Sequence, residues 1–102
     1  MTLQQLRYFL AAAEHGSFTA AARALFIAQP SLSEQVRQLE AELGVELLAR
    51  VGRGIVLTEA GRAFRPEAER VLAGVAQARD AVRDVRELHG GTLSFGMFGT
   101  AS

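Results

Sequence analysis

Residues 28–44, AQPSLSEQVRQLEAELG, contain the pattern that decides the fold. Pro30 stands where the first turn of a helix tolerates proline, and Gly44 stands where a helix commonly ends. Between them, apolar side chains recur at steps of four, three and four residues, which places them on one helical face: Leu32, Val36, Leu39 and Leu43. The stretch therefore predicts a sharply amphipathic helix that buries this face.

The opposite face of this helix is predicted to be exposed. At about 100° per residue, five positions point away from the apolar stripe, and Ser33 lies at its flank. The five positions are Pro30, Glu34, Arg37, Gln38 and Ala41. Near the start of the helix, the side chains on this outward face are therefore short and polar.

Two shorter helices are predicted upstream. Thr2 and Gln5 form a capping-box pattern ahead of apolar residues spaced by three and four, so a first helix is expected to reach about Glu14. Gly16 can take the left-handed position that closes it, and Ser17 can cap a second helix. A turn at residues 26–28 then leads into the amphipathic helix.

A β-hairpin is predicted downstream. Residues 47–51 and 55–58 have the composition of two short strands, and Gly52-Arg53-Gly54 between them suits a hairpin tip because glycine allows unusual backbone angles. The tip presents Arg53.

A long helix follows, capped by Thr58 and expected to run to about Leu88. Pro66 cannot donate a backbone hydrogen bond, so a kink or restart is expected between Phe64 and Pro66. Apolar residues keep alternating steps of four and three, a narrow coiled-coil pattern that calls for a partner helix. This heptad seam comprises Phe64, Ala68, Val71, Val75, Ala78, Val82 and Val85, and it predicts a homodimer.

The expected fold is mainly α: a winged helix-turn-helix of three helices plus a β-hairpin wing, followed by a long dimerisation linker helix. Its predicted domains are the DNA-binding unit at residues 1–58 and the linker at 59–88. Residues 92–97 alternate like a β-strand that lacks a partner strand, so residues 89–102 are expected to lead into a further domain and to contain its first strand.

Composition limits the functions to consider. The 102 residues include no Cys, which excludes disulfides and thiolate metal sites and favours the cytoplasm. No apolar run approaches the roughly 20 residues of a membrane span. Eleven Arg balance eleven Asp plus Glu, and zero net charge is an objection to nucleic-acid binding, so any positive footprint must come from placement rather than excess.

The chain resembles the LysR-type transcriptional regulators in fragments that occur in order and at family spacing over residues 1 to about 88. The fragments are Leu6-Arg7-Tyr8-Phe9, Gly16-Ser17-Phe18-Thr19 with Ala21-Ala22, Ala28-Gln29-Pro30-Ser31-Leu32-Ser33 with Gln35-Val36 and Leu39-Glu40, Leu43-Gly44-Val45, and Leu57-Thr58-Glu59-Ala60-Gly61. Each is weak evidence alone, and together they are highly specific.

The resemblance implies a sequence-specific regulator that binds double-stranded DNA. The third helix would enter the major groove, and the wing would touch flanking backbone or minor groove. The resemblance also implies a linker helix that pairs antiparallel with its twin and tetramers in the full-length protein. By the same resemblance, residues 89–102 would form a hinge and the first strand of an effector-binding domain, and a small-molecule effector would bind only that domain. The protein would act in the bacterial cytoplasm, associated with the nucleoid.

The start of the third helix carries the first candidate DNA contacts. Gln29 can reach a base edge, and the short polar side chains of Ser31 and Ser33 can bond phosphate. Pro30 can set the helix entry and touch a thymine methyl or a sugar. The alternative is that these polar residues only cap the helix.

Three charged residues complete the candidate site. Arg37 can contact phosphate or guanine, or it can pair with a nearby glutamate. Arg53 at the wing tip can contact the backbone or minor groove, or remain solvated. Glu34 departs from the family pattern, because many members carry a basic or neutral polar residue there. A carboxylate that faces DNA repels phosphate, so Glu34 either accepts from cytosine N4 or points away.

Two further departures from the family pattern are Ala28, where a capping hydroxyl is frequent, and Gly54, where a basic residue is frequent. Together with the zero net charge, these departures suggest that a single dimer binds DNA weakly and that this binding is sensitive to salt. The alternative function is a winged-helix dimerisation or protein-interaction module without specific DNA binding.

Enzyme activity is not expected. Neither His15 nor His89 has a carboxylate or a second ligand at metal spacing, and no serine has the base and orienting residue of a nucleophile. We expect no catalytic residue, no metal and no cofactor.

Overall fold

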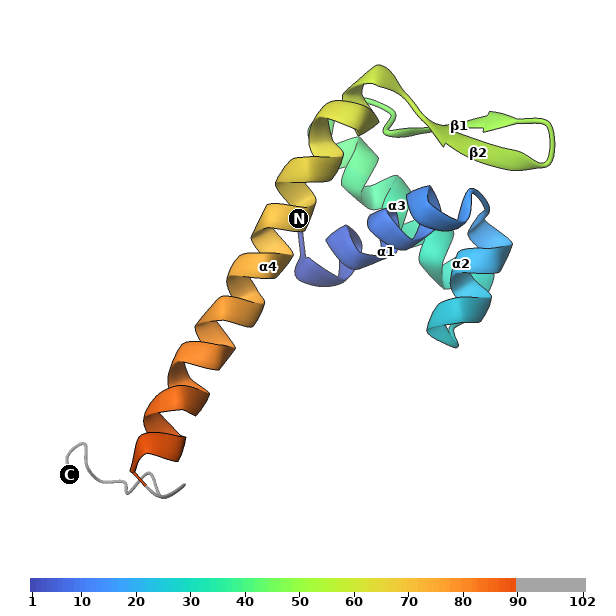
Figure 1. The fold of residues 1–102 in the computed structure, drawn as a ribbon. Coiled ribbons are helices and arrows are strands. Elements are labelled where there is room, and N and C mark those ends of the chain that lie inside the picture. The colour runs from blue at the N-terminus through green and yellow to red at the C-terminus, as the bar shows by residue number, and fades with distance from the viewer. Residues whose placement is uncertain (90–102) are drawn as a thin grey trace. The chain divides into compact units, whose positions relative to one another are not determined.

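The computed structural model describes residues 1–89, and the predicted architecture is confirmed within them (Figure 1). The elements are, in order, α1 (Leu3–His15), α2 (Phe18–Leu25), α3 (Gln29–Leu43), β1 (Leu48–Val51), β2 (Gly54–Leu57) and α4 (Glu59–Leu88). The strand expected at residues 92–97 lies outside the described residues.

The chain forms two compact units, Met1–Leu72 and a second unit that begins at Ala73. The first unit holds the three short helices, the antiparallel β-hairpin and the first turns of α4. The second unit contains the remaining turns of that helix.

Local caps define the helix ends as the sequence predicts. The Thr2 hydroxyl accepts the Gln5 amide at 3.0 Å, and the Gln5 side chain accepts the Thr2 amide at 3.1 Å, a complete capping box. Gly16 closes α1 in the left-handed region at φ 66°, and the Ser17 hydroxyl accepts the Ala20 amide at 3.1 Å. Ala28 gives α3 no side-chain cap, as expected.

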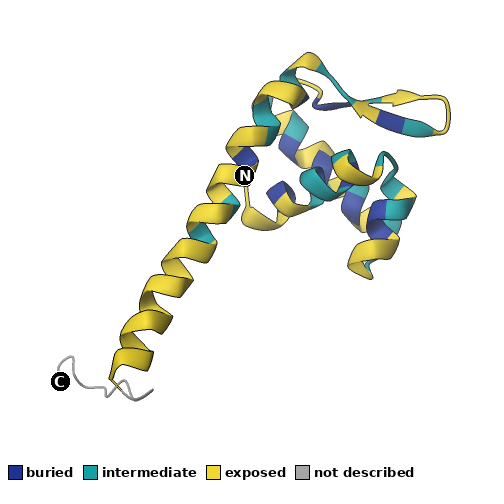
Figure 2. Cartoon of the chain, viewed as in Figure 1, coloured by how far each residue is buried: buried dark blue, intermediate teal, exposed yellow. Residues whose placement is uncertain are grey.

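The core forms where the apolar faces of α1, α2 and α3 meet (Figure 2). Of the predicted stripe on α3, three residues are fully buried, and Leu43 at its end is half-buried. The largest fully buried side chains are Phe9, Leu32, Leu39, Leu47 and Val36. Because Leu47 comes directly before β1, the same core also anchors the start of the wing.

The wing is fastened to α3 by a carboxylate. Glu40 Oε2 accepts the backbone amides of Leu47 at 2.8 Å and Leu48 at 3.1 Å. On the other strand, the Ile55 amide donates to the Gly16 carbonyl at 2.9 Å. The hairpin therefore has fixed contacts at both of its strands.

The hairpin turn is shorter than expected. Val51 pairs with Gly54, so the turn consists of Gly52 and Arg53, and the three-residue tip predicted from the sequence is wrong. A Cβ at Gly54 would lie 2.8 Å from the Gly16 carbonyl oxygen. This close approach requires glycine within the strand and explains the departure from a basic residue there.

Pro66 does not interrupt α4, so the predicted restart is wrong. The helix continues from Glu59 to Leu88 although a proline in its interior removes one hydrogen bond and costs about 3 kcal/mol. Residues on both sides of Pro66 pack against the core. Phe64 meets Phe9 edge-on with ring centroids 5.3 Å apart, and Ala68 is 1% exposed.

Candidate nucleic-acid interface

The outward face of α3 and the strand β1 line a groove of about 760 Å³. Gln29, Pro30 and Ser33 come from the first turns of the helix, and Glu34 and Arg37 come from the next. The structure thus brings five of the seven predicted contact residues to one surface. Ser31 and Arg53 are exposed but do not line the groove.

At the start of α3, Gln29 and Ser33 are joined to each other. The Gln29 side-chain amide donates to the Ser33 hydroxyl at 3.2 Å, and that hydroxyl donates to the Gln29 carbonyl at 3.0 Å. Ser33 therefore bonds within the helix, while Gln29 keeps its side-chain carbonyl oxygen free of any hydrogen bond within residues 1–89. Pro30 is exposed beside them and offers an apolar surface.

One turn further along, Glu34 and Arg37 form a two-pronged ion pair. Arg37 Nε donates to Oε1 at 3.0 Å and Nη2 donates to Oε2 at 2.6 Å, and Gln38 Nε2 adds a bond to Oε2 at 3.2 Å. The Arg37 hydrogen bonds, followed by that from Gln38, lower the pKa of the Glu34 carboxyl. In turn, the hydrogen bonds that Arg37 donates to Glu34 raise the pKa of Arg37.

Arg50 is a groove residue that the sequence did not single out. Its guanidinium lies over the Phe18 ring, 5.4 Å from the centroid, and both residues line the groove. The only available signal was an arginine in the strand next to the predicted tip, and nothing in the sequence places that strand beside Phe18.

The charges of the groove are mixed. Glu34, Glu40 and Glu46 face Arg37 and Arg50. Two of the three carboxylates are already engaged, because Glu40 accepts backbone amides and Glu34 accepts Arg37. The groove therefore carries no excess of positive side chains.

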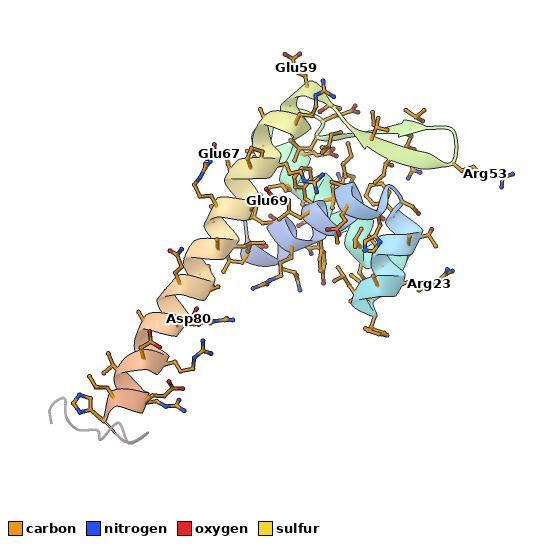
Figure 3. The ribbon with its side chains drawn as sticks, in the orientation of Figure 1. Arg23, Arg53, Glu59, Glu67, Glu69 and Asp80 are labelled. Atoms are coloured by element: carbon orange, nitrogen blue, oxygen red, sulfur yellow. The ribbon has the colours of Figure 1, made fainter. Side chains whose placement is uncertain are left out.

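Arg53 and Arg23 project from the first unit into solvent (Figure 3). Arg53 sits in the turn between β1 and β2, and Arg23 lies in the last turn of α2. Neither takes part in an ion pair within the described part of the chain. Arg23 was not among the predicted contacts, although its place at the end of a helix that precedes α3 is visible in the sequence.

The heptad seam divides into two parts. Phe64 and Ala68 contact the core of their own unit, so the chain itself occupies that end of the seam. Further along, Val71, Val82 and Val85 are 47%, 59% and 48% exposed. Ala78 is also exposed and Val75 is half-buried. These five residues are the part of the seam that a partner can reach.

Neither a metal-ligand cluster nor a membrane helix is found in residues 1–89. No group of three His, Cys, Asp or Glu side chains there could hold an ion. Over the same residues, no helix is both long enough and apolar enough to span a bilayer.

Known proteins are similar to this chain in sequence and in fold. The family model of bacterial regulatory helix-turn-helix proteins of the lysR family matches residues 3–62. The transcriptional regulator TcbR of Pseudomonas sp. strain P51 is 45% identical over 100 residues, 98% of this chain and 34% of that protein. BudR of Klebsiella aerogenes is 45% identical over 97 residues, 95% of this chain and 68% of that protein. Both are transcriptional regulators, which agrees with the expectation of no enzyme activity.

The chain spans about a third of the length of TcbR and of several other curated relatives.

Solved structures of similar chains contain DNA. The CbnR DBD–DNA complex matches with a TM-score of 0.79 and 46% identity, over 83% of this chain and 98% of that chain. The BenM DBD complex with benA site 1 DNA matches with a TM-score of 0.79 and 44% identity, over 83% of this chain and 99% of that chain. Nothing among these matches supports the alternative of a module that has lost DNA binding.

Proposed function

Because this chain belongs to the LysR family of bacterial regulatory helix-turn-helix proteins, we propose that it is the sequence-specific DNA-binding part of a transcription regulator. One observation carries the proposal: the outward face of α3 gathers Gln29, Pro30, Ser33 and Arg37 along the groove beside β1. An α-helix with polar side chains on its free face fits the major groove of B-DNA.

Each contact has a defined chemistry under this proposal. Gln29 keeps a free side-chain carbonyl and can turn its amide to an adenine edge, which offers one donor and one acceptor. Pro30 supplies apolar contact to a thymine methyl. Ser31 is exposed on the first turn and bonds phosphate, as does Ser33 once its hydroxyl leaves the Gln29 carbonyl.

The wing supplies the flanking contacts. Arg53 stands at the turn of the hairpin and reaches the minor groove or the backbone beside it. Arg50 lies on the same hairpin and faces the groove next to α3, where Phe18 supports its guanidinium. Arg50 can therefore neutralise a phosphate that lies between the α3 contacts and the Arg53 contact.

Two copies act together in this proposal. Val71, Val75, Ala78, Val82 and Val85 on α4 form a helix–helix contact between two chains, because apolar side chains at coiled-coil spacing gain free energy when a partner helix covers them. A two-fold dimer presents two α3 helices to two half-sites.

The full-length protein extends these functions. Tetramer assembly and recognition of a small-molecule effector belong to the domain expected beyond this chain, and the protein works in the bacterial cytoplasm at the nucleoid. Tetramers would add affinity through multivalent attachment.

The test is retention of genomic DNA fragments by the purified chain, followed by sequencing. The proposal predicts an enriched sequence with two-fold symmetric half-sites, and binding that weakens steeply as salt rises. Gln29→Glu should lose this enrichment, since it brings a carboxylate to the DNA face. Gln77→Glu, which makes the same change at an exposed position of α4, should retain it. If neither the wild-type chain nor Gln77→Glu enriches a sequence, the proposal is contradicted.

A further inference from the structure

We propose that Glu34 is a positioning residue, which holds the guanidinium of Arg37 in the orientation that reads a guanine. This inference rests on the proposed function and assigns a role in specificity to the carboxylate that is least expected on a DNA-facing helix. It also links two residues that the sequence treats as separate candidates.

The geometry fixes the guanidinium from one side. Its Nε and Nη2 donate to the two oxygens of Glu34 at 3.0 and 2.6 Å, a bidentate arrangement. The Gln38 amide bonds the same carboxylate at 3.2 Å. The three residues lie at positions i, i+3 and i+4 of α3, so one helical face carries the whole group.

The remaining donors of Arg37 form a second edge. A guanidinium has five N–H groups, and the pair with Glu34 uses the Nε–H and one Nη2–H. The other Nη2–H and the Nη1–H parallel to it form a second pair of donors at the end of the guanidinium, and the last Nη1–H points back along the side chain. Two parallel donors are what the O6 and N7 acceptors of guanine require in the major groove.

Direct reading of a base by Glu34 is disfavoured. Its two oxygens already accept three hydrogen bonds, which leaves roughly one of about four acceptor sites of the carboxylate for a cytosine amino group. A lone carboxylate near phosphates would also repel DNA, whereas the pair with Arg37 carries no net charge. The paired state therefore suits a DNA-facing surface better than either partner alone.

The ion pair between Glu34 and Arg37 contributes little to the stability of the fold. The side chains of Arg37 and Glu34 are 66% and 48% exposed, and exposed ion pairs contribute little to stability because water and salt screen them. What the pair does provide is a fixed direction for a long and otherwise mobile side chain. A fixed direction lowers the entropy lost when the arginine docks on a base.

The test is selection of random duplex DNA by the wild-type chain and by Arg37→Ala, Glu34→Gln and Glu67→Gln. The wild-type chain should enrich a guanine at one position of each half-site, and Arg37→Ala should lose that preference by about tenfold or more. Glu34→Gln should weaken the preference for the same guanine by about threefold to tenfold.

Affinity for unrelated duplex separates positioning from general damage. Glu34→Gln removes a negative charge, so its binding to scrambled DNA should equal or exceed that of the wild-type chain. Loss of discrimination without loss of affinity is not the result of a misfolded helix. Glu67→Gln is the matched control, since Glu67 pairs with Arg70 at the same i, i+3 spacing on exposed α4, and it should leave both quantities unchanged.

Three results would overturn the inference. A preference changed by Glu34→Gln at a position that Arg37→Ala leaves intact would show that Glu34 reads a base itself. Tighter binding by Glu34→Gln with undiminished preference for guanine would show that the carboxylate only weakens attraction to DNA. If the wild-type chain enriches no sequence at all, the proposed function fails, and the role of Glu34 fails with it.

Discussion

A methyl group added to Gly61 would stand 2.1 Å from the carbonyl oxygen of Leu47. The first turn of α4 therefore rests directly on the backbone that leads into β1, and only glycine allows this distance. Thr58 ties the same two segments together, because its amide donates to the Leu47 carbonyl at 3.0 Å and its hydroxyl accepts the Gly61 amide at 3.0 Å.

Gly61→Ala is expected to destabilise the chain by about 2 kcal/mol or more, because backbone on both sides must shift to admit the methyl group. Chemical denaturation measures the change. Gly74→Ala is the control, since nothing lies within 4 Å of a Cβ there, and in a helix interior it should stabilise by up to about 1 kcal/mol. Equal stability of Gly61→Ala and wild type would contradict the close contact.

Glu40→Ala is expected to loosen the start of the wing and to cost about 1–3 kcal/mol, because two part-buried amides lose their acceptor. Glu40→Gln should cost much less, since both bonds go to one oxygen that an amide can replace. Hydrogen exchange of the Leu47 and Leu48 amides reports the change directly. Unaltered protection in Glu40→Ala would show that the carboxylate does not hold β1.

The pKa of Glu34 should lie below the value of about 4.3 for a free glutamate, because Arg37 and then Gln38 donate to its charged form. Carboxyl NMR titration measures it, and Arg37→Ala should move the midpoint upward. Since the folded-state pKa is the lower one, the pair's small stabilising effect is present above the unfolded pKa and is lost as pH falls through the folded one. An identical midpoint in both chains would mean that the ion pair does not form in solution.

Replacing Val75 and Val82 together by Glu should convert dimers to monomers in sedimentation experiments, because two buried charges would oppose each other across the helix pair. Ala76→Glu with Gln77→Glu adds the same number of carboxylates next to the seam and should leave the dimer intact. A dimer that persists in the Val75 and Val82 variant would show that another surface joins the chains.

Local pattern was enough to predict most of the fold. The capping residues Thr2, Ser17 and Thr58 act on amides three positions away, so sequence spacing alone reveals them. The period of the apolar residues in α3 likewise identifies the buried face, including Leu32 and Leu39.

The features that could not be predicted from the sequence depend on contacts between segments that are distant in the chain. Gly54 pairs with Val51 in the hairpin, which leaves a two-residue turn, and it also lies against the Gly16 carbonyl, which is far away in the sequence. A heptad pattern also cannot tell whether a residue faces a partner or its own core, and Ala68 faces its own core. In the same way, Arg50 joins the groove only because the fold brings it over Phe18.

The central claim is that α3 reads DNA sequence, and one ratio tests it most directly: the affinity for the enriched duplex divided by the affinity for a scrambled duplex at fixed salt. Gln29→Ala should lower this ratio by about tenfold, because a side-chain amide pair to adenine discriminates by about 1–3 kcal/mol, while affinity for the scrambled duplex stays nearly constant. An unchanged ratio in Gln29→Ala would contradict the account.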